Sequence, residues 1–132
     1  MSAADVPFAY AILRLVPRVE RGERLNVGVV VFCRQRDFLD LRAQIDETRL
    51  AALAPDLDVG AVRDSLEAIR AVVCGEPAGG ALAALPASER FGWVVAPAST
   101  IIQPSQVHTG LTDDPAATLE RLFDTLVAPP SR

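Results

Sequence analysis

The sequence contains no lysine, one histidine and two cysteines among its 132 residues. A structural zinc site needs about four cysteine or histidine ligands at suitable spacing, so we expect no metal site. Cys33 and Cys74 lie far apart in the sequence, and each ends an apolar stretch. Cysteine in such a position usually acts as a small hydrophobic residue. We therefore expect two reduced, buried thiols in place of a disulfide.

Long hydrophobic runs are also missing. No apolar stretch reaches the roughly 18 residues that a membrane-spanning helix needs. The first five residues lack the basic start of a secretion signal. These absences predict a cytoplasmic protein that does not enter a membrane. All 13 basic residues are arginine, a bias typical of a GC-rich bacterial genome.

Positive charge and aromatic residues are in short supply as well. The formal net charge is −4 and aromatic residues make up 5% of the chain, whereas nucleic-acid binding rests on clustered positive charge. We therefore expect no nucleic-acid partner. The sequence also lacks a P-loop, a Gly-x-Gly-x-x-Gly motif and a Gly-x-Ser-x-Gly elbow. It thus predicts no nucleotide or other cofactor.

The apolar residues that are present predict a sheet in the N-terminal part. Half of all residues are hydrophobic, which is enough to build the core of a single domain over residues 1–132. Residues 8–45 predict a three-stranded antiparallel meander, with strands at 8–16, 25–33 and 38–45. The middle strand is apolar on both faces. We expect it to be covered on both sides, by helices or by a second copy of the chain.

Two main helices are expected to pack against this sheet. Apolar residues recur at helical spacing over residues 59–73 and again over residues 115–127. Asp114 and Pro115 are typical of a helix start. A short helix at residues 47–54 precedes the first main helix, so helices are expected over most of residues 47–73.

The remaining segments carry weaker patterns. We interpret residues 76–80 as a flexible connector and residues 87–96 as either helix or strand. Residues 99–111 predict a short strand followed by a polar loop from residue 105. The whole pattern predicts an α+β domain whose antiparallel sheet has about four strands.

Two segments resemble a known bacterial family. Residues 21–32 read Arg-Gly-Glu-Arg-Leu-Asn-Val-Gly-Val-Val-Val-Phe, a Gly-Glu-x-x-Asn-x-Gly lead-in to a valine-rich strand. The second segment runs from Arg-Phe at 90–91 through Ser-Thr-Ile-Ile-Gln-Pro-Ser at 99–105 to Val-His-Thr-Gly-Leu at 107–111. Together they resemble the domain of unknown function 3037 family over nearly the whole chain. The family has no assigned activity or catalytic residue. The resemblance implies a small protein often encoded beside a HipA-like kinase, which would be its partner.

The loop at residues 18–26 holds the first candidate binding residues. Arg21 and Arg24 are candidate anion clamps, because arginine binds carboxylate and phosphate groups through two parallel hydrogen bonds. Asn26 opens the most buried strand, where its amide needs partners. The alternative is that Glu23 and Asn26 fix the turn by satisfying loop backbone groups, while the arginines stay solvated.

A second set of candidate binding residues carries hydrogen-bonding groups without a permanent charge: Ser99, Thr100, Gln103, His108 and Thr109. His108 is the candidate catalytic residue, as a general base near neutral pH. The alternative is that His108 hydrogen-bonds locally and shapes its loop. If this segment lies beside residues 21–26, we expect one mixed polar cleft that also contains Arg90. A strand of ordinary surface polarity is the alternative to that cleft.

No catalytic constellation stands out in the sequence. The leading prediction is therefore a non-enzymatic binding or accessory protein, a partner or regulator of a HipA-like kinase. The alternative is a small hydrolase or transferase acting on a phosphorylated or nucleotide-derived substrate. His108 would be its base, and Arg21, Arg24 or Arg90 would be its anion clamps. Self-association into a homodimer is the other partner prediction.

Overall fold

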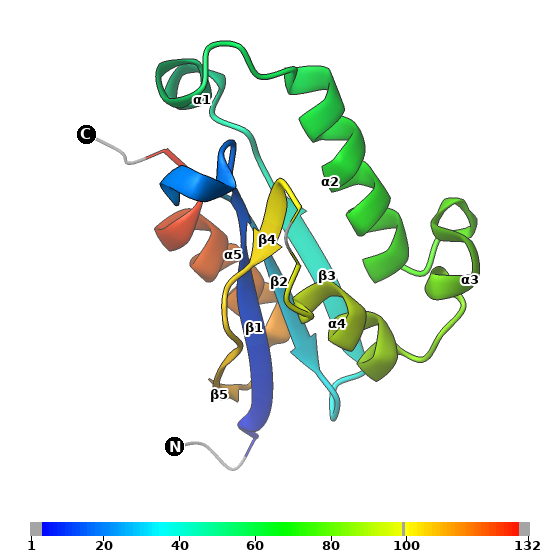
Figure 1. Cartoon of the computed structure of the whole chain (residues 1–132). Helices are drawn as coiled ribbons and strands as arrows, with labels where there is room; N and C mark the ends of the chain where they lie inside the picture. The colour runs from blue at the N-terminus through cyan, green and yellow to red at the C-terminus, as the bar shows by residue number, and fades with distance from the viewer. Residues whose placement is uncertain (1–3, 99, 130–132) are drawn as a thin grey trace.

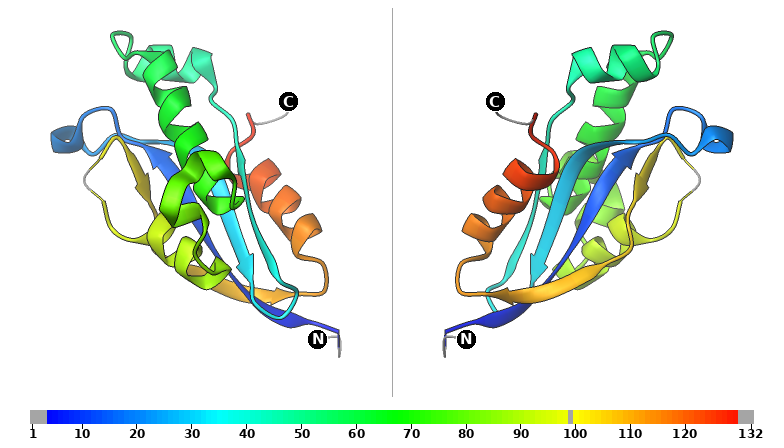
Figure 2. Two further views of the ribbon diagram at one scale, coloured as in Figure 1. Left: turned by 90° about the vertical axis from the view of Figure 1, so that its right-hand side faces the viewer. Right: turned by 90° about the vertical axis from the view of Figure 1, so that its left-hand side faces the viewer.

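The computed structural model describes residues 4–98 and 100–129. They form an α+β fold with one antiparallel sheet, as predicted, and the sheet has five strands (Figure 1). The elements follow in the order β1 (Val6–Leu15), η1 (Val19–Arg21), β2 (Leu25–Cys33), β3 (Phe38–Ala43), α1 (Glu47–Leu53), α2 (Val59–Val73), η2 (Pro77–Gly79), α3 (Gly80–Ala83), α4 (Ala87–Val95), β4 (Ile102–Pro104), β5 (His108–Thr112) and α5 (Pro115–Leu126). Figure 2 shows α5 on one side of the sheet and α2 with α4 on the other.

The predicted N-terminal meander is confirmed. β1 pairs antiparallel with β2, and β2 pairs antiparallel with β3. The sheet order is β3-β2-β1-β4, and β5 also pairs with β1. The connection from β1 to β2 passes through η1, which ends at Gly22, whose left-handed φ of 68° glycine adopts without strain. A tight turn over residues 34–37 joins β2 to β3.

The second edge of β1 carries two short strands. β4 pairs with residues 13–15 of β1, and β5 pairs with residues 6–10. Between β4 and β5, Ser105 also forms hydrogen bonds with β1. Its backbone N–H donates to the Ile12 carbonyl at 2.8 Å, and its hydroxyl accepts from the Ile12 N–H at 2.9 Å. The predicted loop is confirmed over residues 105–107 and wrong over residues 108–111, where β1 satisfies the backbone of a segment whose side chains do not alternate like a strand.

Both faces of β2 are buried, and helices supply the cover. Val27 and Val30 belong to a core formed with α1, α2 and α4, whereas Val29 belongs to a core formed with α5. The β1–β2 register shifts between Leu13 and Arg14, which leaves Val27 as the extra residue of a β-bulge. This bulge explains why two valines three residues apart point into the same core.

Helices α1, α2 and α5 lie where the sequence predicted helices, with bounds within one residue. α1, α2 and α5 each start after an aspartate whose carboxylate accepts from a backbone N–H three residues further on: Asp46, Asp58 and Asp114. Gly75, with φ 69°, follows the C-terminal end of α2. None of the helices in the described part of the chain is long and apolar enough to cross a membrane.

Residues 76–83 are largely helical, so the predicted flexible connector is wrong. η2 and α3 fold back onto the C-terminal half of α2. Gly79 lies against the α2 backbone, where an added Cβ would stand 3.0 Å from the nitrogen of Val72. The ambiguous segment after it is helix α4, which buries Phe91 and Val94.

Candidate functional site

One face of the sheet gathers predicted polar residues around Arg14. Arg14 lies in β1, with Asn26 of β2 paired to it on one side and Gln103 of β4 on the other. Directly paired residues point to the same face of an antiparallel sheet. Arg24 lies two residues before Asn26, just outside β2, and its positive charge acts on Arg14. We call Arg14, Arg24, Asn26 and Gln103 the arginine strip.

Asn26 ties this face of the sheet to the end of α5. Its amide Nδ2 donates to the carbonyl of Leu126, the last residue of α5, at 3.0 Å. Carbonyl groups in the last turn of a helix lack partners within the helix, so the amide satisfies one of them. Asn26 therefore does satisfy a backbone group, as one interpretation predicted. The group belongs to a helix 100 residues further along the chain, and not to the loop of Asn26.

The charges of the arginine strip are not balanced inside the described residues. Arg14 is partly buried, and its pKa is lowered by burial and, secondarily, by the positive charge of Arg24. Within residues 4–98 and 100–129, neither arginine forms an ion pair. Arg21, in contrast, is paired with Glu23. Arg24 is thus the better anion clamp of the two that the sequence predicted.

Arg21 and Glu23 lie on the other side of their loop. With Arg18 they line an open hollow of about 470 Å³ between the loop and α1. The hydrogen bond and the charge of Arg21 lower the pKa of Glu23. Both side chains are exposed, so this pair adds little stability. In this structure the charge of each group is nonetheless matched by the other.

His108 lies further along the sheet face that carries the arginine strip. It is paired with Tyr10, and the two ring centroids are 5.1 Å apart. Tyr10 in turn stacks on Phe8. Tyr10 and Arg14 are four residues apart, about 13 Å along a strand. Within the described part of the chain the imidazole of His108 makes no hydrogen bond, so the backbone pairing of β5 and the ring contact with Tyr10 position it.

Arg90 lies on the opposite side of the sheet, on α4. Its Nη1 donates to the Leu85 carbonyl at 2.7 Å. Its Nε is buried and has no hydrogen-bond partner in the described residues. The guanidinium carbon stands 3.6 Å from the position of a Cβ added at Gly75. Arg90 thus packs where α2 ends, and it does not join the arginine strip.

The other predicted binding residues are dispersed. Thr100 donates its hydroxyl to the Ile102 carbonyl at 2.7 Å. Thr109 is exposed on β5 and pairs with Ala9, which places it on the face opposite to His108. Ser99 lies outside the described residues. The structure brings Arg24, Asn26 and Gln103 together and places His108 on the same face. The single polar cleft that also contains Arg90 is not formed.

An apolar groove lies on the other face, between α2, α4 and β4. It has a volume of about 450 Å³. Trp93, the one tryptophan of the chain, lines it and is 39% exposed. Most of the other lining side chains are apolar, among them Leu13, Ile69, Pro97, Ile101 and Ile102. We call this feature the Trp93 groove. Sequence patterns did not mark it, because its walls come from three segments that only the fold brings together.

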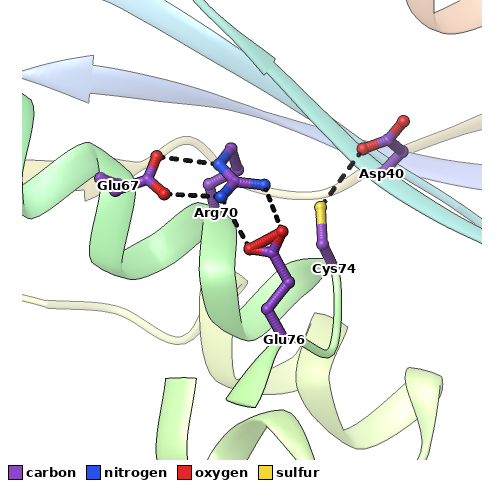
Figure 3. A network of polar contacts seen from close by, with 5 residues as sticks. All are labelled: Asp40, Glu67, Arg70, Cys74 and Glu76. Carbon is purple, nitrogen blue, oxygen red and sulfur yellow. Dashed lines mark hydrogen bonds and ion pairs between the residues drawn. The ribbon is translucent and has the colours of Figure 1, made fainter. Parts of the chain in front are cut away.

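A network of polar contacts lies where α2 ends (Figure 3). Arg70 donates to Glu67 on its own helix and to Glu76 just beyond the helix. Hydrogen bonding to Arg70 lowers the pKa of Glu67. Nearby, the thiol of Cys74 lies 3.7 Å from Oδ1 of Asp40 on β3. Cys74 is exposed, so its predicted burial is wrong, whereas Cys33 is buried as predicted.

Cys74 is expected to react slowly with thiol reagents despite its exposure. Partial desolvation raises the pKa of its thiol, and the negative charge of Asp40 raises it further. The thiolate is the reactive form, so Asp40→Asn should speed alkylation at pH 8 by lowering the pKa. The rate of alkylation as a function of pH, measured on the folded chain, gives the midpoint for each protein.

Asp124→Asn serves as the control, because Asp124 is an exposed acid on α5. It should leave the midpoint where the unmodified chain has it. If Asp40→Asn shifts the midpoint no more than Asp124→Asn does, then Asp40 does not control the thiol. The buried Cys33 provides an internal reference that stays unmodified while the chain is folded.

Comparisons with known proteins identify a family without an assigned function. No curated protein and no solved structure matches the chain. Among the described residues, no group of three histidine, cysteine, aspartate or glutamate side chains is arranged to hold a metal ion. A family model described as "Protein of unknown function (DUF3037)" matches residues 10–127. The matched range includes residues that contribute to both faces of the sheet. Because the match spans most of the sequence, the chain belongs to the DUF3037 family of proteins of unknown function.

Proposed function

We propose that the chain is a non-enzymatic binding protein that receives an apolar segment of a partner protein in the Trp93 groove. The partner implied by the family resemblance is a HipA-like kinase in the bacterial cytoplasm. The groove itself supports this proposal best: it combines an exposed tryptophan with walls that carry few polar groups. Tryptophan is enriched among the residues that dominate binding energy at protein interfaces.

The lining of the groove favours a protein segment over a polar metabolite. Small-molecule sites carry a few well-placed polar groups that fix the orientation of the ligand. In the Trp93 groove, the lining hydroxyls are those of Ser65 and Thr100. The Thr100 hydroxyl is already engaged with the Ile102 carbonyl. Binding there rests on apolar burial, which suits leucine-like or aromatic side chains of a partner.

The hydrolase or transferase alternative stays a prediction. It needs His108 near an anion clamp, and the geometry offers Arg14 on the same face, about 13 Å along β1. Arg90 lies on the α4 side of the sheet, and Arg21 is held by Glu23. The imidazole of His108 contacts the ring of Tyr10 in the described chain. This contact gives it a packing role.

A charge placed in the groove should weaken partner binding. Ala68 is an exposed alanine of α2 that lines the Trp93 groove. Ala68→Glu would bury a carboxylate against an apolar segment, and we expect the affinity to fall by about tenfold or more. Affinity for a HipA-like kinase from the same genome is measured with fluorotryptophan-labelled protein. The single label at residue 93 gives one ¹⁹F resonance, which should shift on binding.

Ala61→Glu is the matched control, since Ala61 is an exposed alanine on the same helix outside the groove. It should bind like the unmodified chain. Equal weakening by both variants, or no shift of the resonance at saturating kinase, would overturn the proposal. A resonance that shifts with the concentration of the chain alone would identify a second copy as the occupant instead.

A further inference from the structure

We propose that the arginine strip binds a phosphate monoester, with Arg14 and Arg24 as its two cationic contacts. The site lies on the side of the sheet where Asn26 meets α5, whereas the Trp93 groove lies on the other side. The inference therefore does not depend on the proposed partner protein.

The sheet register and the charge interaction between Arg14 and Arg24 relate both guanidinium groups to one patch. Paired residues on neighbouring strands have Cβ atoms about 4.5–5.5 Å apart. Arg14 therefore lies directly between Asn26 and Gln103. Arg24 directly precedes β2, and its charge acts on Arg14. Arg14 is partly exposed and Arg24 is exposed, so a ligand can reach both from solvent. Two long side chains whose charges interact can contact the same phosphate group.

This patch brings together two arginines that form no ion pair with a carboxylate in the described residues. Arg21, Arg42, Arg63 and Arg70 each form an ion pair with a glutamate. Within the described residues, Arg14 and Arg24 have no such partner, although their like charges interact. Partial burial of Arg14 adds a desolvation cost to this repulsion. A bound anion would offset both effects.

The two amides add donors without adding charge. An amide nitrogen carries two N–H groups. Asn26 uses one on the Leu126 carbonyl at 3.0 Å, and Gln103 uses one on the Thr100 carbonyl at 2.9 Å. In the described residues, each amide keeps its second N–H for a ligand oxygen. The bonds already made hold the two amides in place beside Arg14.

A phosphate monoester matches this donor set. Arginine binds phosphate through two parallel, charge-assisted hydrogen bonds. A monoester carries a charge of about −1.5 to −2 at pH 7, which balances two guanidinium groups. A carboxylate carries one charge, and so does each phosphodiester of a nucleic acid. The net negative charge of the chain also disfavours nucleic-acid binding. The monoester would come from a free metabolite or from a phosphorylated side chain.

Isothermal titration calorimetry on the full chain tests this site. The probes are inorganic phosphate, ribose 5-phosphate, a short phosphoserine peptide and the same peptide without phosphate. We expect the phosphorylated probes to bind and the unmodified peptide not to bind. Arg14→Gln and Arg24→Gln should each weaken the binding by roughly tenfold or more. Arg49→Gln, an exposed arginine of α1, should leave it unchanged.

The probes also separate the two sources of the monoester. A phosphopeptide that binds about tenfold tighter than ribose 5-phosphate supports a phosphorylated side chain, and the reverse order supports a free metabolite. The proposal is overturned if no phosphorylated probe binds up to about 10 mM or if Arg24→Gln has no effect. Equal weakening by Arg49→Gln, or tighter binding of an oligonucleotide than of any monoester, also overturns it. Arg24 is exposed before β2, so its variant tests the site even if Arg14→Gln fails to fold.

Discussion

Replacing Phe123 with alanine is expected to lower the free energy of unfolding by about 3–5 kcal/mol. Phe123 is 3% exposed and belongs to the core that α5 forms with β1 and β2, together with Phe8 and Leu119. The variant leaves a cavity, because the helix can close over it only in part. Small domains are stable by about 5–15 kcal/mol, so much of the stability should be lost. Urea unfolding followed by circular dichroism measures the change.

Arg42→Gln is the control, because Arg42 contacts the same Phe123 ring from the surface of the sheet. The Arg42 guanidinium lies 4.7 Å from the centroid of the Phe123 ring and pairs with Glu120. Both partners of that ion pair are about half exposed, so we expect a loss of at most about 1 kcal/mol. A loss as large as that of Phe123→Ala would mean that surface charge, and not the buried ring, holds α5 on the sheet.

The sequence predicted best those helices and strands whose own residues, or residues directly beside them, favour the element. β2 occupies residues 25–33, as predicted, because its valine-rich run ends at polar residues on both sides. The prediction for α2 was correct over residues 59–73, where an aspartate cap precedes an apolar stripe and a glycine follows it. Each of these signals depends on side chains within one turn or one strand of the feature that they predict.

The errors fall where distant parts of the chain decide the structure. β5 forms because β1 offers a free edge about 100 residues earlier in the sequence, and its own side chains do not alternate like a strand. Residues 76–83 become helical through contact with α2. Propensity within either segment could not reveal its partner, since tertiary packing overrides weak local preferences.

In the candidate site, too, the residue types could be predicted from the sequence, whereas their spatial arrangement could not. Arg24, Asn26 and Gln103 were predicted from residue type, although they lie in two distant segments. Their meeting depends on the strand order, which places β2 and β4 on opposite edges of β1. Arg14 was overlooked, although a single charge inside an apolar strand was a usable signal. Arg90 was wrongly grouped with them, because sequence does not reveal on which side of the sheet a helix packs.

Gly79→Ala is expected to destabilise the chain by about 1–3 kcal/mol. An added Cβ would lie 2.7 Å from the Cβ of Ala83 and about 3 Å from backbone atoms of Val72 and Ala71. Backbone atoms inside α2 cannot move aside as a flexible side chain can. The substitution should therefore push η2 and α3 away from α2. Denaturant unfolding, with the native secondary structure checked by circular dichroism, measures the loss.

Gly92→Ala is the matched control and should change stability in the opposite direction. Gly92 lies inside α4, and an added Cβ there meets nothing within 4 Å. Alanine favours helix over glycine by up to about 1 kcal/mol, so a gain is expected. Gly79 also has a helical backbone, with φ −79°, and both substitutions restrict the unfolded chain alike. The difference between the two variants therefore isolates the contact with α2. Stabilisation by both would show that residues 76–83 do not pack on that helix.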